Sequence, residues 1–272
     1  MTPPPQQRPE RGRGRPASKA QREGLGGEQI EGRRAVRELL KARRRRVRDV
    51  WLSESADPDH PVVAEILDLA TEGRVPIRQV SRGRLDGEAR SEAPQGVLAH
   101  TEPLPDVDVE RLVERRQGRP TPFLLVLDGV TDPQNLGALL RTADAAGVTG
   151  VVLARHRAVH VTPTVAKAAA GAVEYVPISL VSGIPAAMRT LASAGVWTVG
   201  LDGDAEQSLF HLELATEPVA LVLGAEGTGL SRLVRERCDV LAAIPQQGSL
   251  ASLNVGAAGA IACFEVARRR LG

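Results

Sequence analysis

The strongest constraint on the fold is a regular alternation, within residues 121–272, between short apolar runs and Ala-rich segments. The apolar runs span 123–129, 150–154, 173–179, 196–203, 219–226 and 240–245. Nearly continuous apolar runs separated by helical segments are typical of parallel strands that are buried on both faces. The pattern therefore predicts an α/β domain with a parallel sheet covered by helices on both sides. Ligands bind such sheets at the carboxyl ends of the strands, so a site is expected in the loops after residues 128, 202, 223 and 245.

A smaller αβ module is expected ahead of this domain, over residues 25–103. Val36, Leu39 and Leu40 recur at helical spacing, which predicts an amphipathic helix. The expected elements of the module are helices over 27–42 and 60–73 and strands over 47–53, 75–81 and 93–103. Gly73 is a natural end for the second helix.

The segments that flank this module have the composition of irregular chain. Residues 1–24 are rich in Pro, Gly and Arg and cannot bury enough apolar surface to order themselves, so a disordered basic tail is expected. Residues 104–120 combine proline with a polar run, which predicts a linker between the module and the domain at 121–272.

The net charge of the chain is only +2, but its basic residues are concentrated at the front. Residues 1–24 hold six basic residues against two acidic ones, and residues 33–48 hold nine against one. A basic front on an otherwise acidic chain is typical of proteins that bind polyanions, because Lys and Arg release counterions from phosphates. The four consecutive arginines Arg43 to Arg46 repel one another unless an anion is near. We expect this run either to contact RNA or DNA or to form a solvated helix face.

Nothing in the sequence indicates a secreted or membrane protein. The chain has no apolar run of roughly 20 residues, and its N-terminus is rich in Pro and Arg where a secretory signal would be apolar. Cys238 and Cys263 are expected to be small core residues with reduced thiols. We therefore expect a cytoplasmic protein without a membrane partner.

The first candidate loop lies in "VLDGVTDPQNLGALLRTADAAGV", residues 126–148. Pro133 suits the first position of a helix, and Asp132 suits its N-cap. Capping explains neither Asn135 nor Arg141, since an arginine among leucines is costly to bury unless it is paired. Helix capping and a functional site therefore both remain possible for this loop.

Two further loops have unusual content. "LVLGAEGTGLSRLV" follows a strand with three glycines and one acid, Glu226, and lacks the Lys and Ser/Thr of a phosphate-binding P-loop. "IPQQGSLASLNVGAAGAIACFEVAR" places five polar side chains before a helix, namely Gln246, Gln247, Ser249, Ser252 and Asn254. The three loops contain no cysteine nucleophile, no metal-ligand cluster and no Ser-His-Asp set. An acid, an arginine, amides and hydroxyls suit the binding and polarisation of a hydroxyl group better than hydrolysis.

Together, the three loops resemble the signature motifs of the SpoU branch of the SPOUT RNA methyltransferases, and the resemblance covers residues 121–272. It implies methyl transfer from S-adenosylmethionine to a ribose 2′-hydroxyl. "EGRRAVRELL" and "APQGVLA" resemble the ribosomal-protein-like RNA-binding domain of the branch that modifies a guanosine in 23S rRNA. Pro94 stands where that branch commonly has His, and Gly256 replaces the usual Ser.

The resemblance also implies a fold, an assembly and a cofactor site. It implies a deep trefoil knot formed by the C-terminal segment, and a homodimer with the catalytic site near the interface. It places the cofactor against loops that begin near Leu201, Gly224 and Ile244, with Leu253 alongside, and it involves no metal.

In the catalytic site the resemblance assigns Asn135 to positioning the ribose and Arg141 to a place beside the attacking oxygen, surrounded by Glu226, Ser252 and Asn254. Arg141 could act as a base or as an electrostatic stabiliser, because a guanidinium holds its proton strongly. Other substrates that stay open are a tRNA guanosine and a 23S rRNA adenosine. A non-catalytic RNA-binding protein with the same fold is the remaining alternative.

Overall fold

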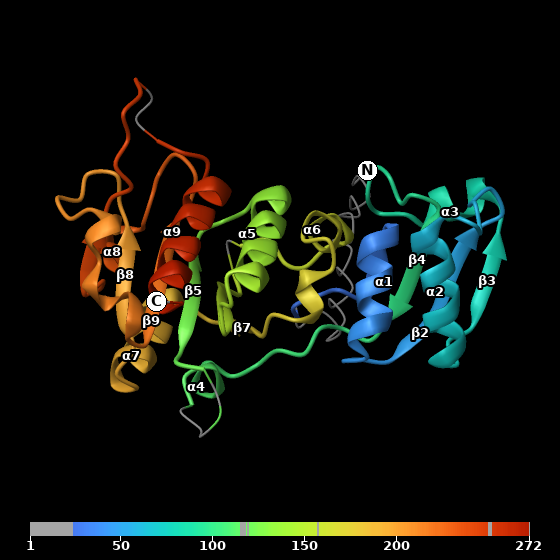
Figure 1. Cartoon of the computed structure of the whole chain (residues 1–272), viewed down its shortest axis with the longest axis horizontal. Helices are drawn as coiled ribbons and strands as arrows, with labels where there is room; N and C mark the ends of the chain where they lie inside the picture. The colour runs from blue at the N-terminus through green and yellow to red at the C-terminus, as the bar shows by residue number, and fades with distance from the viewer. Residues whose placement is uncertain (1–23, 115–117, 119, 157, 250–251, 272) are drawn as a thin grey trace, which may run out of the picture.

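The computed structural model describes residues 24–114, 118, 120–156, 158–249 and 252–271. The expected basic tail, apart from Gly24, lies outside these residues. The described chain forms two β-sheets with their own helices, and Figure 1 shows them as two lobes side by side. Helices α1 (Arg33–Ala42) and α6 (Pro163–Ala168) face each other between the lobes.

The N-terminal lobe has a four-stranded sheet in the order β1-β4-β2-β3. Its strands are β1 (Gln29–Glu31), β2 (Val47–Ser53), β3 (Ile77–Val80) and β4 (Val97–Thr101), and its other helices are α2 (Pro61–Glu72) and α3 (Arg82–Glu88). The strand predicted over 47–53 is confirmed, and so is the helix that ends at Gly73. β4 runs antiparallel to β1 and β2, whereas β2 and β3 are parallel.

The first helix was predicted to start at residue 27, and this start is wrong. Residues 29–31 form β1 instead, and the helix begins at Arg33 after Gly32, whose φ of 90° breaks the chain direction. The Glu31 carboxylate is buried and accepts hydrogen bonds from the backbone of Arg90 (2.7 Å) and Ser91 (3.0 Å). β1 therefore depends on partners about 60 residues away, which a local pattern does not contain.

The C-terminal lobe has six strands in the order β10-β8-β9-β5-β6-β7, all parallel. The strands are β5 (Phe123–Asp128), β6 (Gly150–Ala154), β7 (Ile178–Val181), β8 (Trp197–Leu201), β9 (Val219–Gly224) and β10 (Val240–Ala242). The other helices are α4 (Val109–Leu112), α5 (Pro133–Ala145), α7 (Ile184–Ser193), α8 (Arg232–Arg235) and α9 (Val255–Arg270). Short 3-10 turns span Ala172–Glu174, Leu209–His211 and Glu213–Thr216. The predicted α/β class with a parallel sheet is confirmed.

Helices cover both faces of this sheet. Within β5, Leu125 and Leu127 pack in one apolar cluster with residues of α5 and α9, whereas Leu124 and Val126 pack in another with residues of α4 and α7. Alternate side chains of one strand thus serve two cores, which explains its continuous apolar sequence. α4 falls within the segment that was expected to be a linker, and its Leu112 is buried.

The strand predicted over 173–179 is displaced in the structure, where β7 begins only at Ile178. Residues 172–174 form a 3-10 turn after Gly171, which has a φ of 91°. Val173 and Val176 are buried all the same. Val173 and Val176 are apolar because they are buried in the segment before β7. The hydrophobicity of a residue does not show whether it is buried in a turn or in a strand.

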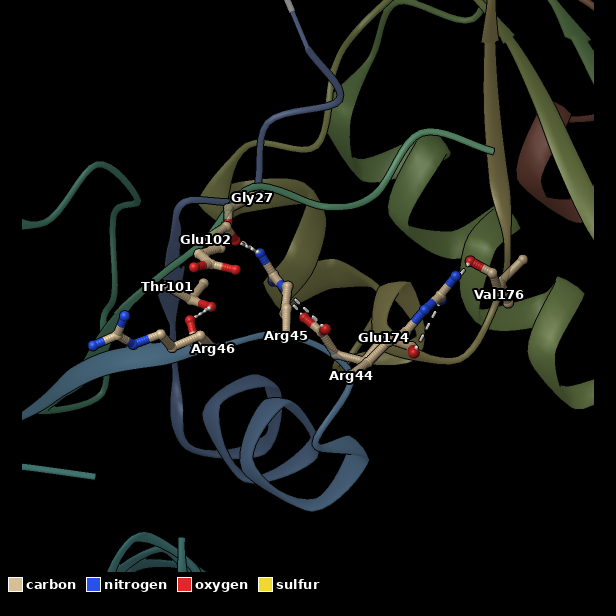
Figure 2. A network of polar contacts seen from close by, with 8 residues as sticks. All are labelled: Gly27, Arg44, Arg45, Arg46, Thr101, Glu102, Glu174 and Val176. Carbon is tan, nitrogen blue, oxygen red and sulfur yellow. Dashed lines mark hydrogen bonds and ion pairs between the residues drawn. The ribbon is translucent and has the colours of Figure 1, made fainter. Parts of the chain in front are cut away.

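The arginine run joins the two lobes. Arg45 forms an ion pair with Glu174, with Nη2 2.5 Å from Oε1, and their side chains are only 3% and 1% exposed. The Arg45 guanidinium also donates to the carbonyl oxygens of Gly27 (2.6 Å) and Glu102 (2.5 Å). Arg44 donates to the carbonyl oxygen of Glu174 at 3.2 Å, and its guanidinium lies on the opposite side of Glu174 from that of Arg45 (Figure 2).

This arrangement corrects both interpretations of the run. Arg45 is neither part of a solvated helix face nor free to bind RNA, because it is buried at the junction. Arg44 also reaches across the junction but remains exposed. Arg43 pairs with Glu72 at 2.8 Å on the surface. Arg46 is exposed and points away from the junction in Figure 2.

Candidate active site

The site begins where β5 and β9 end side by side. Asp128 lies opposite Gly224 in the sheet register, so the loops that follow the two strands start next to each other. The strand order reverses at this point, since β6 and β7 extend to one side of β5 and β8 and β10 lie beyond β9. A reversal of this kind opens a crevice at the carboxyl edge of a parallel sheet.

A chain of side-chain hydrogen bonds connects the three candidate loops. Asn254 Nδ2 donates to Asn135 Oδ1 at 2.9 Å, and Asn135 Nδ2 donates to Glu226 Oε2 at 3.0 Å. The three residues come from the start of α9, the start of α5 and the loop after β9. Asn135 uses both ends of its amide in this chain, so its orientation is set by the two other loops.

Helix capping accounts for the polar residues beside this chain. Asp132 Oδ1 accepts from the backbone N–H of Asn135 at 2.8 Å, and Pro133 is the first residue of α5. Asn254 Oδ1 accepts from the backbone N–H of Gly256 at 2.9 Å and so caps α9. The capping interpretation of the first loop is confirmed, and Asp132 leaves the Asn135 side chain free for the hydrogen-bond chain, whereas the functional interpretation stays a prediction.

Ser252 and Leu253 lie directly before Asn254 and are exposed. Within the described residues, Ser252 has no hydrogen bond to Asn135 or Glu226. Leu253 presents an apolar side chain that is 39% exposed. These two residues are therefore next to Asn254 in sequence but are not part of the hydrogen-bond chain.

The expected cofactor residues share one edge of the sheet. Leu201 and Gly224 end the neighbouring strands β8 and β9, and Ile244 lies two residues beyond the end of β10. All three are half-buried. Asp202 follows Leu201, and its hydrogen bond from Arg235 lowers the pKa of its carboxyl, so the acid is ionised and already paired.

Gly224 is required by the loop that follows it. A Cβ built there would lie 2.1 Å from the backbone carbon of Gly229 and 2.3 Å from the nitrogen of Leu230. The loop folds back closely because Ala225 and Gly229 exchange backbone hydrogen bonds of 3.0 and 2.9 Å. The close approach that a glycine permits at this position is made by the loop itself.

Arg141 does not contact the hydrogen-bond chain. It lies six residues after Asn135 on α5, which places it about 9 Å along the helix axis and roughly 120° around it. It is exposed, and within the described part of the chain it makes no hydrogen bond or ion pair. Its side chain lines a cavity between the two lobes, together with Arg34 and Lys167.

The residues around Arg141 were missed from the sequence. Lys167 lies in an Ala-rich helical segment. The one signal in the sequence that could have indicated a function for it is that it is a single charged residue among apolar ones. Arg33 and Arg34 were counted in the basic front without a defined place. The cavity brings residues of both lobes together, so no local motif contains it.

Some other chemistries have no support in the described residues. No group of three or more His, Cys, Asp or Glu side chains in the described ranges could hold a metal ion. Burial raises the pKa of the thiols of Cys238 and Cys263 to about 12, so both are protonated at neutral pH. None of the helices in the described residues is long and apolar enough to cross a bilayer.

Comparison with known proteins identifies the class to which this fold and site belong. Residues 122–264 match the model of the SpoU rRNA Methylase family, and residues 29–107 match that for RNA 2'-O ribose methyltransferase substrate binding. The chain therefore belongs to the SpoU rRNA methylase family, as its three loops suggested. It is 42% identical to the 23S rRNA (guanosine-2'-O-)-methyltransferase RlmB of Pseudomonas putida, over 89% of this chain and 97% of that protein.

Solved structures share the fold across both lobes. An AdoMet-bound rRNA methyltransferase from Sinorhizobium meliloti is 25% identical with a TM-score of 0.72, and the match covers 90% of this chain and 88% of that one. The SpoU methyltransferase AviRb from Streptomyces viridochromogenes has a TM-score of 0.74 at 24% identity, covering 89% of this chain and 90% of that one, and supports the fold alone.

Proposed function

We propose that this protein transfers a methyl group from S-adenosylmethionine to the ribose 2′-hydroxyl of a guanosine in 23S rRNA. The observation that carries the proposal is the hydrogen-bond chain Asn254–Asn135–Glu226, which joins the three family loops at the carboxyl edge of the sheet. The Pseudomonas putida relative, which bears this activity in its name, matches over nearly its whole length. The match includes the substrate-binding lobe, which favours rRNA over tRNA as the substrate.

The cofactor residues fit S-adenosylmethionine. Leu201, Gly224 and Ile244 provide half-buried apolar surface and backbone at three neighbouring strand ends, which suits a flat adenine ring. Leu253 adds an exposed apolar side chain next to Asn254. When bound, the cofactor supplies a methyl group on a sulfonium, which is already activated for transfer. Leu201, Gly224 and Ile244 would hold the cofactor at the same edge of the sheet from which Asn135 projects.

The remaining residues act on the ribose. Asn135, held in one orientation by Glu226 and Asn254, binds and orients the target nucleotide, and much of the rate acceleration comes from this positioning. Ser252 offers a hydroxyl beside it. Arg141 has five N–H donors and no acceptor. It therefore stabilises negative charge on the attacking oxygen or the adjacent phosphate, while the hydroxyl proton passes to solvent water as the oxygen–methyl bond forms and the sulfur–methyl bond breaks.

The test of the proposal is methylation of ribosomal RNA from a strain that lacks the gene. Full-length protein and labelled S-adenosylmethionine are expected to place label on one ribose of 23S rRNA, mapped by nuclease protection and mass spectrometry. Transfer to tRNA alone, or to a 23S adenosine, would contradict the substrate. Absence of transfer with intact RNA binding would favour a non-catalytic RNA-binding protein.

We also propose the trefoil knot that is typical of the family. β10 is the outermost strand beyond β8, whereas α9, which follows it, packs on α5 and β9. The chain after residue 242 must therefore cross back over the carboxyl ends of β8 and β9. This return path supports a threaded C-terminus, and it brings Asn254 to Asn135.

A homodimer is the assembly that the surface of α9 favours. Ala257, Ile261 and Phe264 are exposed at helical spacing on this helix, and Phe264 is 51% exposed. Nearby Phe210, whose carbonyl oxygen accepts from Arg269, is 42% exposed. An exposed apolar stripe on a helix beside a catalytic edge is typical of a subunit interface. We propose that two copies pack through this stripe, and that the dimer works in the cytoplasm, where its rRNA is found.

Replacing Phe264 by glutamate is expected to shift the protein from dimer to monomer, because a buried charge without a partner opposes association. Sedimentation velocity at micromolar concentration measures the change. Leu271→Glu is the matched control, since Leu271 is 90% exposed at the end of α9, and it should leave the dimer intact. A monomeric wild-type protein, or a dimeric Phe264→Glu variant, would contradict the interface.

A further inference from the structure

A cavity of about 660 Å³ lies between the two lobes, close to the start of α1. Its lining residues are Gly32, Arg33, Arg34, Ala35, His60, Val62, Gln95, Arg141, Lys167 and Ala170. Three of these are arginines, one is a lysine and none is acidic. The basic side chains come from both lobes, with Arg33 and Arg34 on α1 and Arg141 and Lys167 on the opposite wall.

The polar groups of the cavity are arranged as donors. Arg34 and Arg141 make no hydrogen bond or ion pair with any residue that the structure describes. His60 Nδ1 accepts from the backbone N–H of Val62 at 3.2 Å, so in the neutral ring Nε2 carries the proton and is a donor. Two unpaired guanidinium groups and an imidazole donor around one cavity match the oxygens of an anion.

The wall formed by the 90–96 loop is held by both lobes. Lys167 Nζ donates across the junction to the carbonyl oxygen of Ala93 at 2.6 Å. Arg33 donates from its backbone to Gln95 Oε1 at 3.1 Å and from Nε to the Gln95 carbonyl oxygen at 3.2 Å. Gln95 has a φ of 57°, which is uncommon for a residue with a side chain. The loop is thus held in an unfavourable conformation by contacts that also shape the cavity.

The distance between the two walls is fixed by buried contacts. The Arg45–Glu174 ion pair closes one part of the junction, and Tyr175 donates to Glu38 Oε2 at 2.7 Å in another. A Cβ built at Gly171 would lie 2.5 Å from Glu38 Cβ, so the backbone of one lobe lies directly against a side chain of the other there. The cavity is therefore formed before any ligand arrives.

A second cavity of about 370 Å³ adjoins the first and shares Arg34 and Arg141 with it. It contains Glu38 and Asp144, so it is less suited to an anion. The Glu38 carboxylate is taken up by Arg37 at 2.6 Å and by Tyr175. The first cavity, which has no acidic lining, is the better anion site of the two.

We propose that the first cavity binds a backbone phosphate of the RNA substrate, with Arg34 of the N-terminal lobe and Lys167 of α6 as positioning residues beside Arg141. This inference rests on the proposed function for the identity of the RNA. Arg141 stands on the same helix as Asn135, about 9 Å further along its axis, so a phosphate held here fixes the strand that carries the target ribose. The N-terminal lobe then contributes to the geometry of the reaction as well as to affinity.

The test uses full-length protein and a 23S rRNA transcript. Arg34→Gln and Lys167→Gln are each expected to weaken RNA binding about 10-fold at low salt and to lower the slope of log affinity against log salt by about 0.7 to 0.9 per lost contact. KM for the transcript should rise in parallel. S-adenosylmethionine affinity should stay unchanged in both variants, and the thermal unfolding midpoint should stay unchanged in Arg34→Gln, whose side chain has no hydrogen bond within the described residues. Arg34→Lys and Lys167→Arg should keep the salt slope of the wild-type protein.

Arg189→Gln is the control, because this substitution also removes one positive charge. Arg189 is exposed on α7, on the other face of the large sheet from the cavity. If Arg34→Gln and Lys167→Gln match this control in affinity and salt slope, the phosphate site is wrong. Failure of the proposed function is seen separately, as wild-type protein that binds the transcript and transfers no methyl group. A loss of binding that the charge-conserving variants do not restore would also overturn the site.

Discussion

Replacing Arg141 by alanine is expected to lower the rate of methyl transfer by about two to three orders of magnitude and to leave the affinity for S-adenosylmethionine within about twofold. The loss follows from removing a charged donor that acts on the transition state. The affinity is preserved because Arg141 lines the cavity between the lobes and has no contact with the strand ends that hold Leu201, Gly224 and Ile244.

Single-turnover transfer to 23S rRNA and calorimetry with S-adenosylmethionine measure the two quantities. Leu253→Glu is the comparison variant that should lose cofactor affinity. Leu253 is exposed beside the expected cofactor site, and a charge there should weaken cofactor binding about 10-fold or more. If Arg141→Ala loses cofactor affinity to the same degree, Arg141 supports the cofactor loops, and its role in the transfer step is refuted.

Replacing Glu174 by alanine is expected to lower the free energy of unfolding by about 3–5 kcal/mol, because it leaves the buried Arg45 guanidinium without its counter-charge. The Arg45 side chain is 3% exposed and has no access to solvent that could compensate. The two carbonyl oxygens that it also contacts, those of Gly27 and Glu102, carry only partial charge.

Urea unfolding followed by circular dichroism gives the free energy. Glu72→Ala is the control, since Glu72 and its partner Arg43 are 63% and 62% exposed, and the loss of such a pair should cost about 1 kcal/mol or less. Replacing Arg45 and Glu174 together with Met and Leu should recover most of the stability. Equal effects of Glu174→Ala and Glu72→Ala would show that the junction pair is not buried in solution.

The parts of the fold that depend on local pattern could be predicted from the sequence. Strand 47–53 and the helix ending at Gly73 were correct because alternation and helix-end signals lie within the segments themselves. β1 was missed because its Gln29 and Glu31 are buried by groups from residues 88–91. In the sequence, polar side chains that are buried by distant partners look the same as the polar side chains of an exposed segment.

The residues of the candidate site also divide into those that local sequence indicates and those that depend on distant contacts. Asn135, Glu226 and Asn254 were found because each lies in a loop with an unusual local composition, and the structure brings all three together. The cavity around Arg141 could not be found, since its walls come from two lobes. The arginine run was misinterpreted for a related reason, because the partner of Arg45 is an isolated Glu174 that no motif marks.

The position of that ion pair has a consequence for how the protein is made. Arg45 leaves the ribosome 129 residues before Glu174, and the N-terminal lobe is complete in sequence long before its counter-charge exists. Until the turn at 172–174 has emerged, Arg44 and Arg45 of the nascent lobe lack the partners that Glu174 supplies. The finished protein buries one of them completely. A separately expressed N-terminal lobe would therefore carry a basic surface that the mature protein lacks, and its RNA affinity would overstate that of the lobe in place.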